Sequence, residues 1–335
     1  MSIEDLESIA QAMVAPGKGI IAIDESTTTI AKRFKAVGIE NTEEHRRAYR
    51  EMLLTSPKLS EHISGAILYD ETLRQSAADG RSLVQVMNDA GIIPGIKVDK
   101  GAHPLAGCPG EKVTEGLDGL RARLDEYVRM GAKFAKWRAV IAITETTPSS
   151  TCIEANCHAL ARYAALCQEA GLVPMVEPEV LMDGDHDLDV CYEVTEATLR
   201  SLFGALYEHN VMLEGAILKA SMVVSGAGCP EQADVDDVAD ATVRCLKATV
   251  PALLPGIVFL SGGQSDERAT AHLNAMNRLG PHPWPLSFSY GRAMQQAALK
   301  LWADDMKGNY AAAQATVAER ARDNGRAALG QWEGS

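Results

Sequence analysis

The segment EGAILKASMVV, residues 214–224, places one lysine, Lys219, inside an apolar run that otherwise reads as a buried strand. Burial and nearby like charge both lower the pKa of a lysine from its reference value of about 10.4. A lysine that has lost its proton is a nucleophile and can form a Schiff base with a carbonyl group. Lys219 is therefore a candidate nucleophile. The alternative is a lysine whose stem is buried while its charge reaches the surface.

Charged residues also mark the ends of other apolar segments, several of them at alternate positions. Residues two apart in a strand lie on the same face, so each such pair points to one side. Structural ion pairs are the alternative interpretation, but buried ion pairs add little stability, so their number favours a functional site. Asp24 ends the first segment, and the pairs are Lys97 with Asp99, Lys136 with Arg138, and Glu177 with Glu179.

The composition of this group restricts the chemistry. Lysines among carboxylates match Schiff-base catalysis, in which a neutral amine attacks a carbonyl group and neighbouring groups move protons. Lys219 has the most apolar surroundings and is the predicted nucleophile, with Lys136 as its cationic neighbour. Glu177 and Asp24 are predicted to transfer protons.

The segments LSGGQS and SYGRA end the last two apolar runs and precede helical patterns. Glycine allows backbone N–H groups to approach an anion, and a helix N-terminus favours negative charge. Arg292, in the second segment, has a guanidinium fork that matches phosphate oxygens. These features predict a phosphate site, and plain strand-to-helix turns are the alternative.

The histidines and acidic residues do not indicate a metal site. The eight histidines are dispersed, with no His-x-His and no pair at metal-ligand spacing on one helix face. The acidic segment 183–189, DGDHDLD, is interpreted as a polar loop that supplies the N-cap of the following helix. We therefore expect neither a catalytic metal nor a cofactor.

Eight apolar segments must position these residues, and each precedes a segment of helical periodicity. Such alternation over roughly 300 residues predicts a parallel (β/α)8 TIM barrel, whose active site forms at the carboxyl ends of the strands. An open doubly wound sheet is the competitor, but the turn AIDESTTT lacks the glycine that fold needs. One extra helix precedes the first strand, and the expected strands are residues 19–24, 63–70, 92–99, 134–141, 172–181, 213–223, 256–263 and 286–291.

Composition limits the domain count, the partners and the location. No linker interrupts the chain, so residues 1–335 are expected to form one domain, with a polar, mobile tail at about 320–335. The net charge of −13 argues against nucleic acid or an anionic membrane as a partner. Seven scattered cysteines without a CxxC pair are typical of a reduced, cytoplasmic protein. An anionic substrate would require basic residues to gather locally against the overall charge.

Eight motifs together resemble the class I fructose-1,6-bisphosphate aldolase family, in family order over roughly residues 10–330. They are GKGIIAIDEST, GIKVDKG, AKWRAV, VEPEVL, DGDHDL, LEGAILK, FLSGGQS and FSYGRA. The resemblance implies reversible, metal-independent cleavage of a ketose phosphate, fructose 1,6-bisphosphate, to dihydroxyacetone phosphate and glyceraldehyde 3-phosphate. It also implies a homo-oligomer, commonly a tetramer, although the sequence does not separate a tetramer from a dimer.

The resemblance assigns roles to individual residues. Lys219 matches the Schiff-base lysine, Glu177 the group that helps to dehydrate the carbinolamine, and Asp24 the base of carbon–carbon cleavage. Lys136 and Glu179 match residues that flank the amine. One phosphate pocket matches Ser261, Gly262, Gly263, Ser289, Gly291 and Arg292, and the groups around the other end of the sugar match Arg33, Lys97 and Arg138 with Ser26 and Thr29.

Three departures from the familiar family pattern concern the site. Ala220 and Ser221 follow the lysine where the familiar form has proline and asparagine, and strand one reads AID where the animal form has a second alanine. The animal enzymes end in a tyrosine that assists proton exchange on the enamine, whereas this sequence has no tyrosine after Tyr310. The hypothesis here is that Glu177, or a water that it positions, protonates the enamine.

Two other functions are alternatives. A non-catalytic scaffold derived from the same barrel is disfavoured because none of Asp24, Lys136, Glu177 and Lys219 is replaced. Another Schiff-base sugar-phosphate lyase, such as a transaldolase, is disfavoured because two phosphate pockets need explanation. The sequence does not decide between a bisphosphate and a monophosphate substrate.

Overall fold

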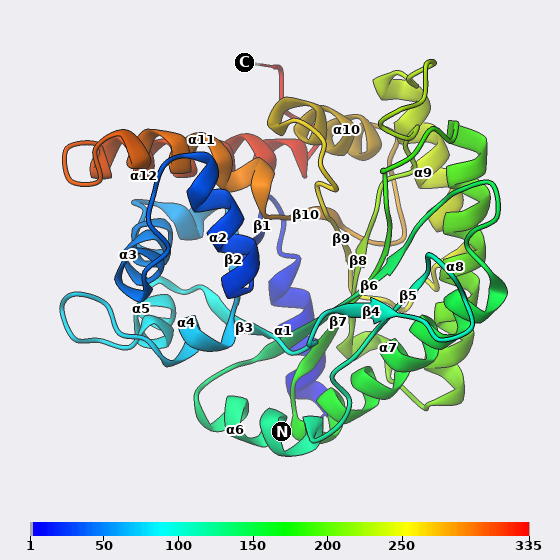
Figure 1. Ribbon diagram of the computed structural model, residues 1–335, viewed down its shortest axis with the longest axis horizontal. Coiled ribbons are helices and arrows are strands. Elements are labelled where there is room, and N and C mark those ends of the chain that lie inside the picture. Colours follow the sequence, from blue (N-terminus) through cyan, green and yellow to red (C-terminus); the bar gives the residue numbers. More distant parts are fainter. Residues whose placement is uncertain (1–2, 335) are drawn as a thin grey trace.

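The eight apolar segments form short parallel strands that close into a barrel, in the order β1-β10-β9-β8-β7-β6-β3-β2 (Figure 1). The structure is a computed structural model and describes residues 3–334. Each strand lies within a predicted segment, so the prediction of a TIM barrel is confirmed. The strands are β1 (Gly19–Ile23), β2 (Ile63–Leu68), β3 (Ile93–Lys97), β6 (Phe134–Ile141), β7 (Val173–Val180), β8 (Ile217–Ala220), β9 (Ile257–Phe259) and β10 (Leu286–Tyr290).

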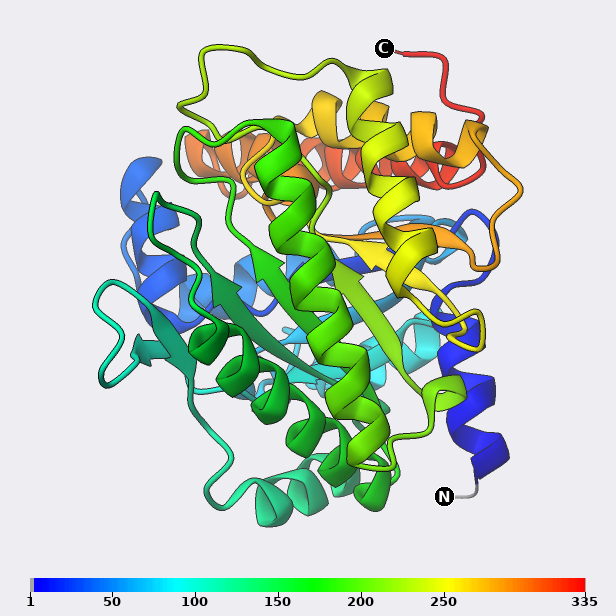
Figure 2. The same cartoon turned by 90° about the vertical axis from the view of Figure 1, so that its right-hand side faces the viewer.

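Helices follow the strands and cover the outside of the barrel. In Figure 2, the green to yellow helices α7, α8 and α9 run in front of the strands. Several helices begin at a capping side chain, as where Ser149 accepts a hydrogen bond from the N–H of Cys152 (3.1 Å). The helices are α1 (Ile3–Met13), α2 (Thr27–Ala36), α3 (Glu43–Leu54), α4 (Asp70–Arg74), α5 (Leu83–Ala90), α6 (Leu120–Arg129), α7 (Ser150–Ala170), α8 (Leu188–Glu208), α9 (Val235–Thr249), α10 (Asp266–Arg278), α11 (Arg292–Asp304) and α12 (Tyr310–Ala327), with short 3-10 turns at Leu59–Glu61 and Leu213–Gly215.

Alternate residues of each strand point into the barrel or out toward the helices. The inward residues near the strand starts are apolar, and Ile20, Met175 and Ile217 pack in one cluster with Leu6 and Met13 of α1. In Figure 1, α1 is seen through the ring of strands, and Figure 2 shows it beside the starts of the strands. The helix before the first strand therefore packs against the amino-terminal end of the barrel, and the carboxyl end is left for polar residues.

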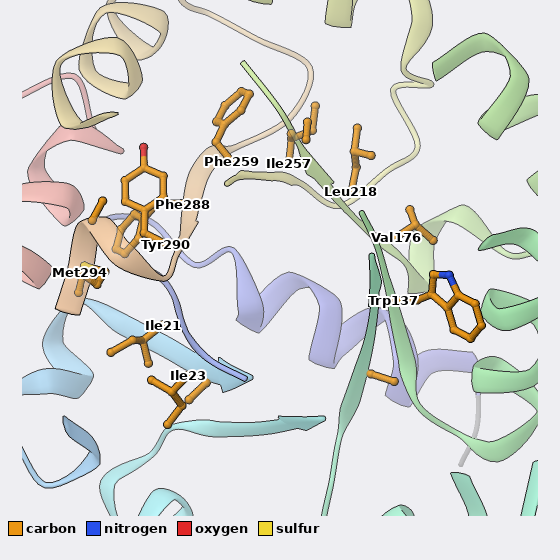
Figure 3. Packing of buried hydrophobic residues seen from close by; sticks show 14 of the residues in the cluster. Ile21, Ile23, Trp137, Val176, Leu218, Ile257, Phe259, Phe288, Tyr290 and Met294 are labelled. Atoms are coloured by element: carbon orange, nitrogen blue, oxygen red, sulfur yellow. The ribbon is translucent and has the colours of Figure 1, made fainter. Parts of the chain in front are cut away.

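The outward residues form the larger core between strands and helices. Trp137 of β6, Val176 of β7 and Leu218 of β8 are buried there, and Figure 3 shows them pointing away from the barrel interior. Because these residues alternate with the charged ones, burial of the outward face fixes which way the charged side chains point. A shift of one residue in register would reverse both faces.

Several segments differ from the sequence prediction. A hairpin of β4 (Ala102–Pro104) and β5 (Lys112–Thr114) forms in the loop after β3, where strands of three residues leave no periodic signal. Helices α3 and α4 were not predicted either. The tail is shorter than residues 320–335, because residues up to Ala327 belong to α12, and its small side chains, such as that of Ala321, pack fully buried. Among residues 3–334, no helix has both the length and the apolar character to span a membrane.

Candidate active site

The carboxyl ends of the strands surround a cavity of about 1040 Å³. It lies opposite the end of the barrel that packs on α1, as expected for an active site in this fold. Every predicted site residue except Gly263 lines the cavity, namely Asp24, Ser26, Thr29, Arg33, Lys97, Lys136, Arg138, Glu177, Glu179, Lys219, Ser261, Gly262, Ser289, Gly291 and Arg292. The structure thus brings together residues from strands that are far apart in the sequence.

Lys219 is buried beside a carboxylate on the neighbouring strand. Parallel pairing of β7 with β8 places Glu177 next to it, and the distance from Lys219 Nζ to Glu177 Oε1 is 3.2 Å. Lys136 Nζ, from β6, lies 2.7 Å from the other oxygen of Glu177 and 3.0 Å from Asp24 Oδ2. Only 3% of Lys219 is exposed to solvent. Two amines and two carboxylates therefore alternate in one buried row.

These contacts set the protonation states of the row. Burial lowers the pKa of Lys219 by more than the attraction of Glu177 raises it, and the charge of Lys136 lowers it further. Burial would also lower the pKa of Lys136, but Asp24 and Glu177 outweigh burial and raise it. Burial would raise the pKa of both carboxyls, yet the lysines hold them below their usual range. Lys219 is the member of the row that is shifted toward its neutral form.

Two further charged pairs lie at the cavity wall. Arg138 forms an ion pair with Glu179, so Glu179 contacts an arginine rather than the amine of Lys219. Burial would lower the pKa of Arg138, but Glu179 raises it. Lys97 Nζ lies 2.5 Å from Asp99 Oδ1, and the N–H of Arg138 donates to Asp99 Oδ2 (3.2 Å). The predicted pairs at alternate positions therefore supply both signs of charge to the same wall.

The first turn of α2 contributes hydroxyl groups to the cavity. Ser26 caps the helix by accepting from the N–H of Thr29 (3.3 Å), and the two hydroxyl oxygens are 3.0 Å apart. Arg33, one turn later, forms an ion pair with Glu25, which is 7% exposed and also accepts from Gln295 Nε2 (3.1 Å). The guanidinium of Arg33 is thus held at the cavity by a buried carboxylate.

The loop after β9 is a tight turn built by two glycines. Gly262 and Gly263 have φ angles of 58° and 102°, a region that side chains rarely adopt, and the N–H of Gln264 donates to the carbonyl of Ser261 (2.9 Å). A Cβ on Gly263 would lie 3.2 Å from Nη2 of Arg292. Gly263 does not line the cavity itself. Because it has no side chain, it leaves room for the guanidinium of Arg292 to approach the turn.

The donors beside this turn are not satisfied by the protein. The hydroxyl of Ser289 is buried without a hydrogen-bond partner in the described part of the chain. Arg292 is exposed at the first position of α11 and forms no ion pair with any of residues 3–334. An anion bound at this point would satisfy both groups and the helix N-terminus.

Several residues of the wall were missed by the sequence prediction. Glu25 had a signal, because it lies next to Asp24, whereas Asp99 already belongs to the predicted pair with Lys97. The others come from loops and helices, where spacing gives no indication of the cavity. They include Tyr69, Asp70, Arg74, Arg123, Glu126 and Tyr127, and several of them are linked by bonds such as that from the Tyr127 hydroxyl to Asp70 (2.9 Å).

The acidic segment 183–189 has the capping role that the sequence predicts. Asp187 is the N-cap of α8 and accepts from the N–H of Val190 (2.9 Å). Within residues 3–334, no group of three or more His, Cys, Asp and Glu side chains is arranged to hold a metal ion.

The fold and the site together define a class of protein. It is a TIM-barrel enzyme with a buried lysine of lowered pKa between carboxylates, and with basic or unpaired donor groups on two sides of the cavity. Such a lysine suits Schiff-base chemistry on a carbonyl compound, and the donors suit anionic groups on that compound.

Comparisons with known proteins identify the family. Residues 5–335 match the family model described as "Glycolytic: Fructose-bisphosphate aldolase class-I". The "Probable fructose-bisphosphate aldolase class 1" of Xanthomonas campestris pv. campestris is 76% identical over 334 residues, which cover 100% of both chains. The "Fructose-bisphosphate aldolase 5, cytosolic" of Arabidopsis thaliana is 52% identical over 332 residues, 99% of this chain and 92% of the relative.

A solved structure agrees with the sequence relatives. It is the fructose-bisphosphate aldolase from Plasmodium falciparum, in a ternary complex with TRAP and a small-molecule inhibitor. The TM-score is 0.97 at 48% identity, over 99% of this chain and 96% of that one. The chain therefore belongs to the class I fructose-bisphosphate aldolase family, and it is a lyase of the Schiff-base class. The family, the fold and the enzyme class predicted from the sequence are confirmed.

Proposed function

We propose that this chain cleaves fructose 1,6-bisphosphate reversibly to dihydroxyacetone phosphate and glyceraldehyde 3-phosphate, through a Schiff base on Lys219. The observation that supports this assignment most directly is the buried amine of Lys219, which lies 3.2 Å from a carboxylate and is shifted toward its neutral form. The names of the relatives support the substrate.

The first step is formation of the imine. Glu177, ionised in the free protein, accepts the proton of Lys219, and the neutral amine then attacks the keto carbon of the substrate. In the resulting carbinolamine, Glu177 returns the proton to the hydroxyl group, which leaves as water. Lys136, 2.7 Å from Glu177, stabilises the carboxylate whenever it is ionised.

The second step is cleavage of the bond between C3 and C4. The protonated imine accepts the electron pair of that bond and becomes an enamine, while the C4 hydroxyl loses its proton and becomes an aldehyde. Asp24 is the base, because Lys136 lies 3.0 Å from it and keeps its pKa low, so that it is ionised before it receives the proton.

Protonation of the enamine and hydrolysis of the imine complete the cycle. Asp24 releases to solvent the proton it took from the C4 hydroxyl, and Glu177 takes one up from solvent. Glu177, or a water that it positions, then protonates the enamine, since Glu177 is the carboxyl in contact with Lys219. Hydrolysis consumes the water that left during imine formation and regenerates the amine.

The two sides of the cavity bind the two ends of the substrate. The turn after β9 and the start of α11 bind one phosphate, since the Ser289 hydroxyl and the Arg292 guanidinium beside them have no partner in the described part of the chain. The basic residues on the opposite walls bind the rest of the sugar phosphate, and Lys136 and Glu179 flank the reacting centre. The first phosphate site comprises Ser261, Gly262, Gly263, Ser289, Gly291 and Arg292, and the second region comprises Arg33, Lys97, Arg138, Ser26 and Thr29.

Borohydride trapping tests the assignment. Treatment with dihydroxyacetone phosphate and borohydride should inactivate the protein irreversibly and label Lys219, as located by peptide mass mapping. Borohydride without the ketose phosphate, and Lys219→Met with it, should give no label. Label on another lysine, or loss of activity in EDTA, would contradict the proposal.

The location and the assembly are also proposals. A cytoplasmic location is supported by the relative from Arabidopsis thaliana that is named cytosolic. A homo-oligomer, either tetramer or dimer, is supported by the family resemblance of the sequence. Light scattering coupled to size-exclusion chromatography measures the mass directly, and a monomer would contradict the second proposal.

A further inference from the structure

Residues 173–180 of β7 face residues 217–222 of β8 and the loop after it, and we call this contact the β7–β8 seam. Backbone hydrogen bonds connect only part of the seam. Val173 and Leu181 donate their N–H groups to carbonyl oxygens on the β6 side (3.1 and 2.9 Å), so the odd-numbered residues of β7 bond toward β6. The even-numbered residues therefore bond toward β8. Two of these, Pro174 and Pro178, have no N–H to donate, and proline is unusual inside a central strand for that reason.

The gap at Pro178 lies level with the reacting residues. Continuing the register of β7 with β8 puts Glu177 beside Lys219 and Pro178 beside Ala220. Strand β8 ends at Ala220, whereas β7 continues to Val180. The backbone ladder between the two strands thus stops at the point where the amine must be held against the carboxylate.

The side chain of Ser221 closes the seam beyond this gap. The N–H of Val180 donates to Ser221 Oγ (3.0 Å), and the hydroxyl of Ser221 donates to the carbonyl of Val180 (3.1 Å). One hydroxyl thereby replaces both the donor and the acceptor that a strand residue would offer. Ser221 is 6% exposed, so water has little access to compete for these bonds.

The other edge of β8 is held differently. On the β9 side, the N–H of Leu260 donates to the carbonyl of Ala220 (3.0 Å), which is an ordinary ladder bond. Beyond the backbone pair of Val176 with Leu218, the end of β8 is therefore fixed by backbone on the β9 side and by the Ser221 hydroxyl on the β7 side. Loss of the Ser221 hydroxyl would leave both polar groups of Val180 unsatisfied and free the end of β8 on the β7 side.

We propose that Ser221 is a positioning residue, which holds Lys219 beside Glu177 by closing the seam that Pro178 leaves open. This inference rests on the proposed role of Lys219 as the nucleophile. Small displacements of reacting groups are costly, because an amine that is not aligned with its proton acceptor and with the carbonyl carbon reacts slowly.

Single-turnover imine formation tests the proposal. Dihydroxyacetone phosphate is mixed with the protein and the imine is trapped with borohydride at successive times. Ser221→Ala should slow imine formation by about 10- to 100-fold, with the ketose phosphate concentration at half saturation changed by no more than about twofold. Ser221→Thr keeps the hydroxyl and should restore most of the rate.

Ser225→Ala is the matched control. Ser225 is also buried, at 4% exposure, and its hydroxyl also accepts a backbone hydrogen bond, from Ala233 (3.1 Å), but it lies in the loop after the seam. This variant should form the imine at the wild-type rate. The proposal is overturned if Ser221→Ala reacts as fast as Ser225→Ala, or if Ser221→Thr is as slow as Ser221→Ala.

A second variant keeps the test decisive if Ser221→Ala does not fold. Ser221→Cys has nearly the same size and a weaker donor, and it should form the imine more slowly than wild type while unfolding at the same urea concentration. A wild-type rate in this variant would overturn the proposal. Labelling of Lys219 in the wild type separates the two proposals, since failure of that labelling contradicts the function and not only the role of Ser221.

Discussion

The two halves of the cavity differ in how their polar groups are satisfied. In the lysine half (Asp24, Lys136, Glu177 and Lys219), every charged group contacts an opposite charge within 3.2 Å. In the phosphate half (Ser261, Gly262, Gly263, Ser289 and Arg292), the Ser289 hydroxyl and the Arg292 guanidinium have no such partner among residues 3–334.

This difference separates two tasks. Paired charges in a buried row fix protonation states before the substrate arrives, which is what proton transfer and amine attack require. Unpaired donors can form hydrogen bonds with a bound anion, so they favour binding of a phosphate group. Substitutions in the lysine half should therefore change kcat, whereas substitutions in the phosphate half should change KM.

The largest expected effect comes from Glu177→Gln. The amide keeps the shape of the carboxyl but cannot exchange the protons of imine formation, so kcat should fall by about 10²- to 10⁴-fold with KM changed little. Steady-state kinetics measure both constants. Glu169→Gln removes a carboxylate from an exposed ion pair with Arg121 and serves as the control without effect. An increase in KM at unchanged kcat for Glu177→Gln would mean that Glu177 binds the substrate rather than transfers protons, which contradicts the division of tasks between the two halves.

The next effect belongs to the phosphate half. Arg292→Ala removes a charged donor that has no ion-pair partner among residues 3–334. A hydrogen bond to a charged group contributes about 1.5–3 kcal/mol, so KM should rise roughly 10- to 100-fold at nearly constant kcat. The inhibition constant of inorganic phosphate should rise with it. Arg121→Ala, on the surface, is the control. A loss confined to kcat would show that Arg292 acts on the reacting atoms.

The sequence predicts the lysine half better than the surroundings of the phosphate half. Lys219 and Glu177 could be placed because the two-residue period of strands and the closure of a barrel bring strand ends together. The glycines of the turn after β9 also predicted a phosphate site from the sequence. That the Ser289 hydroxyl finds no hydrogen-bond partner within residues 3–334 depends on every neighbouring side chain, and no local pattern encodes it.

Contacts between helices and strands also escape the sequence. The ion pair of Arg33 with Glu25 requires α2 to fold back on the end of β1, and a hydrogen bond from Gln295 fixes the same carboxylate. Such contacts depend on tertiary packing rather than on spacing. The same reason explains why residues 320–327, the end of α12, were predicted to belong to the tail, since small and polar residues indicate a loop unless another helix covers them.

Asp24→Asn extends the comparison to pH. The charge of Asp24 raises the pKa of Lys219, so its removal should lower that pKa further and keep the amine neutral at lower pH. The acid limb of imine formation with dihydroxyacetone phosphate should therefore move to lower pH, although cleavage of the bisphosphate is lost. Borohydride trapping over a pH series measures the limb, and Arg292→Ala should keep the wild-type limb. A move to higher pH in Asp24→Asn would contradict the assignment.

The smallest effect concerns stability. The pKa of Lys219 in the folded protein is below its ordinary value of 10.5, so between these two values the unfolded chain binds more protons and the folded state becomes more stable as pH rises. Lys219→Met removes this cost and should raise the free energy of unfolding at neutral pH by about 1 kcal/mol, the usual size of a single-substitution effect.

The pH dependence of the gain in stability shows whether Lys219→Met acts by removing a buried amine or by improving the packing of the core. Above pH 10.5, lysine is neutral in both states, so the advantage of Lys219→Met should disappear there, whereas a packing gain would persist. Urea unfolding at neutral and alkaline pH measures the difference. A variant less stable than wild type at neutral pH would mean that the contact with Glu177 stabilises the fold by more than burial of the amine costs. The paired charges of the lysine half would then stabilise the folded protein, which the unpaired donors of the phosphate half do not do. The reactive amine would in that case cost the protein no stability.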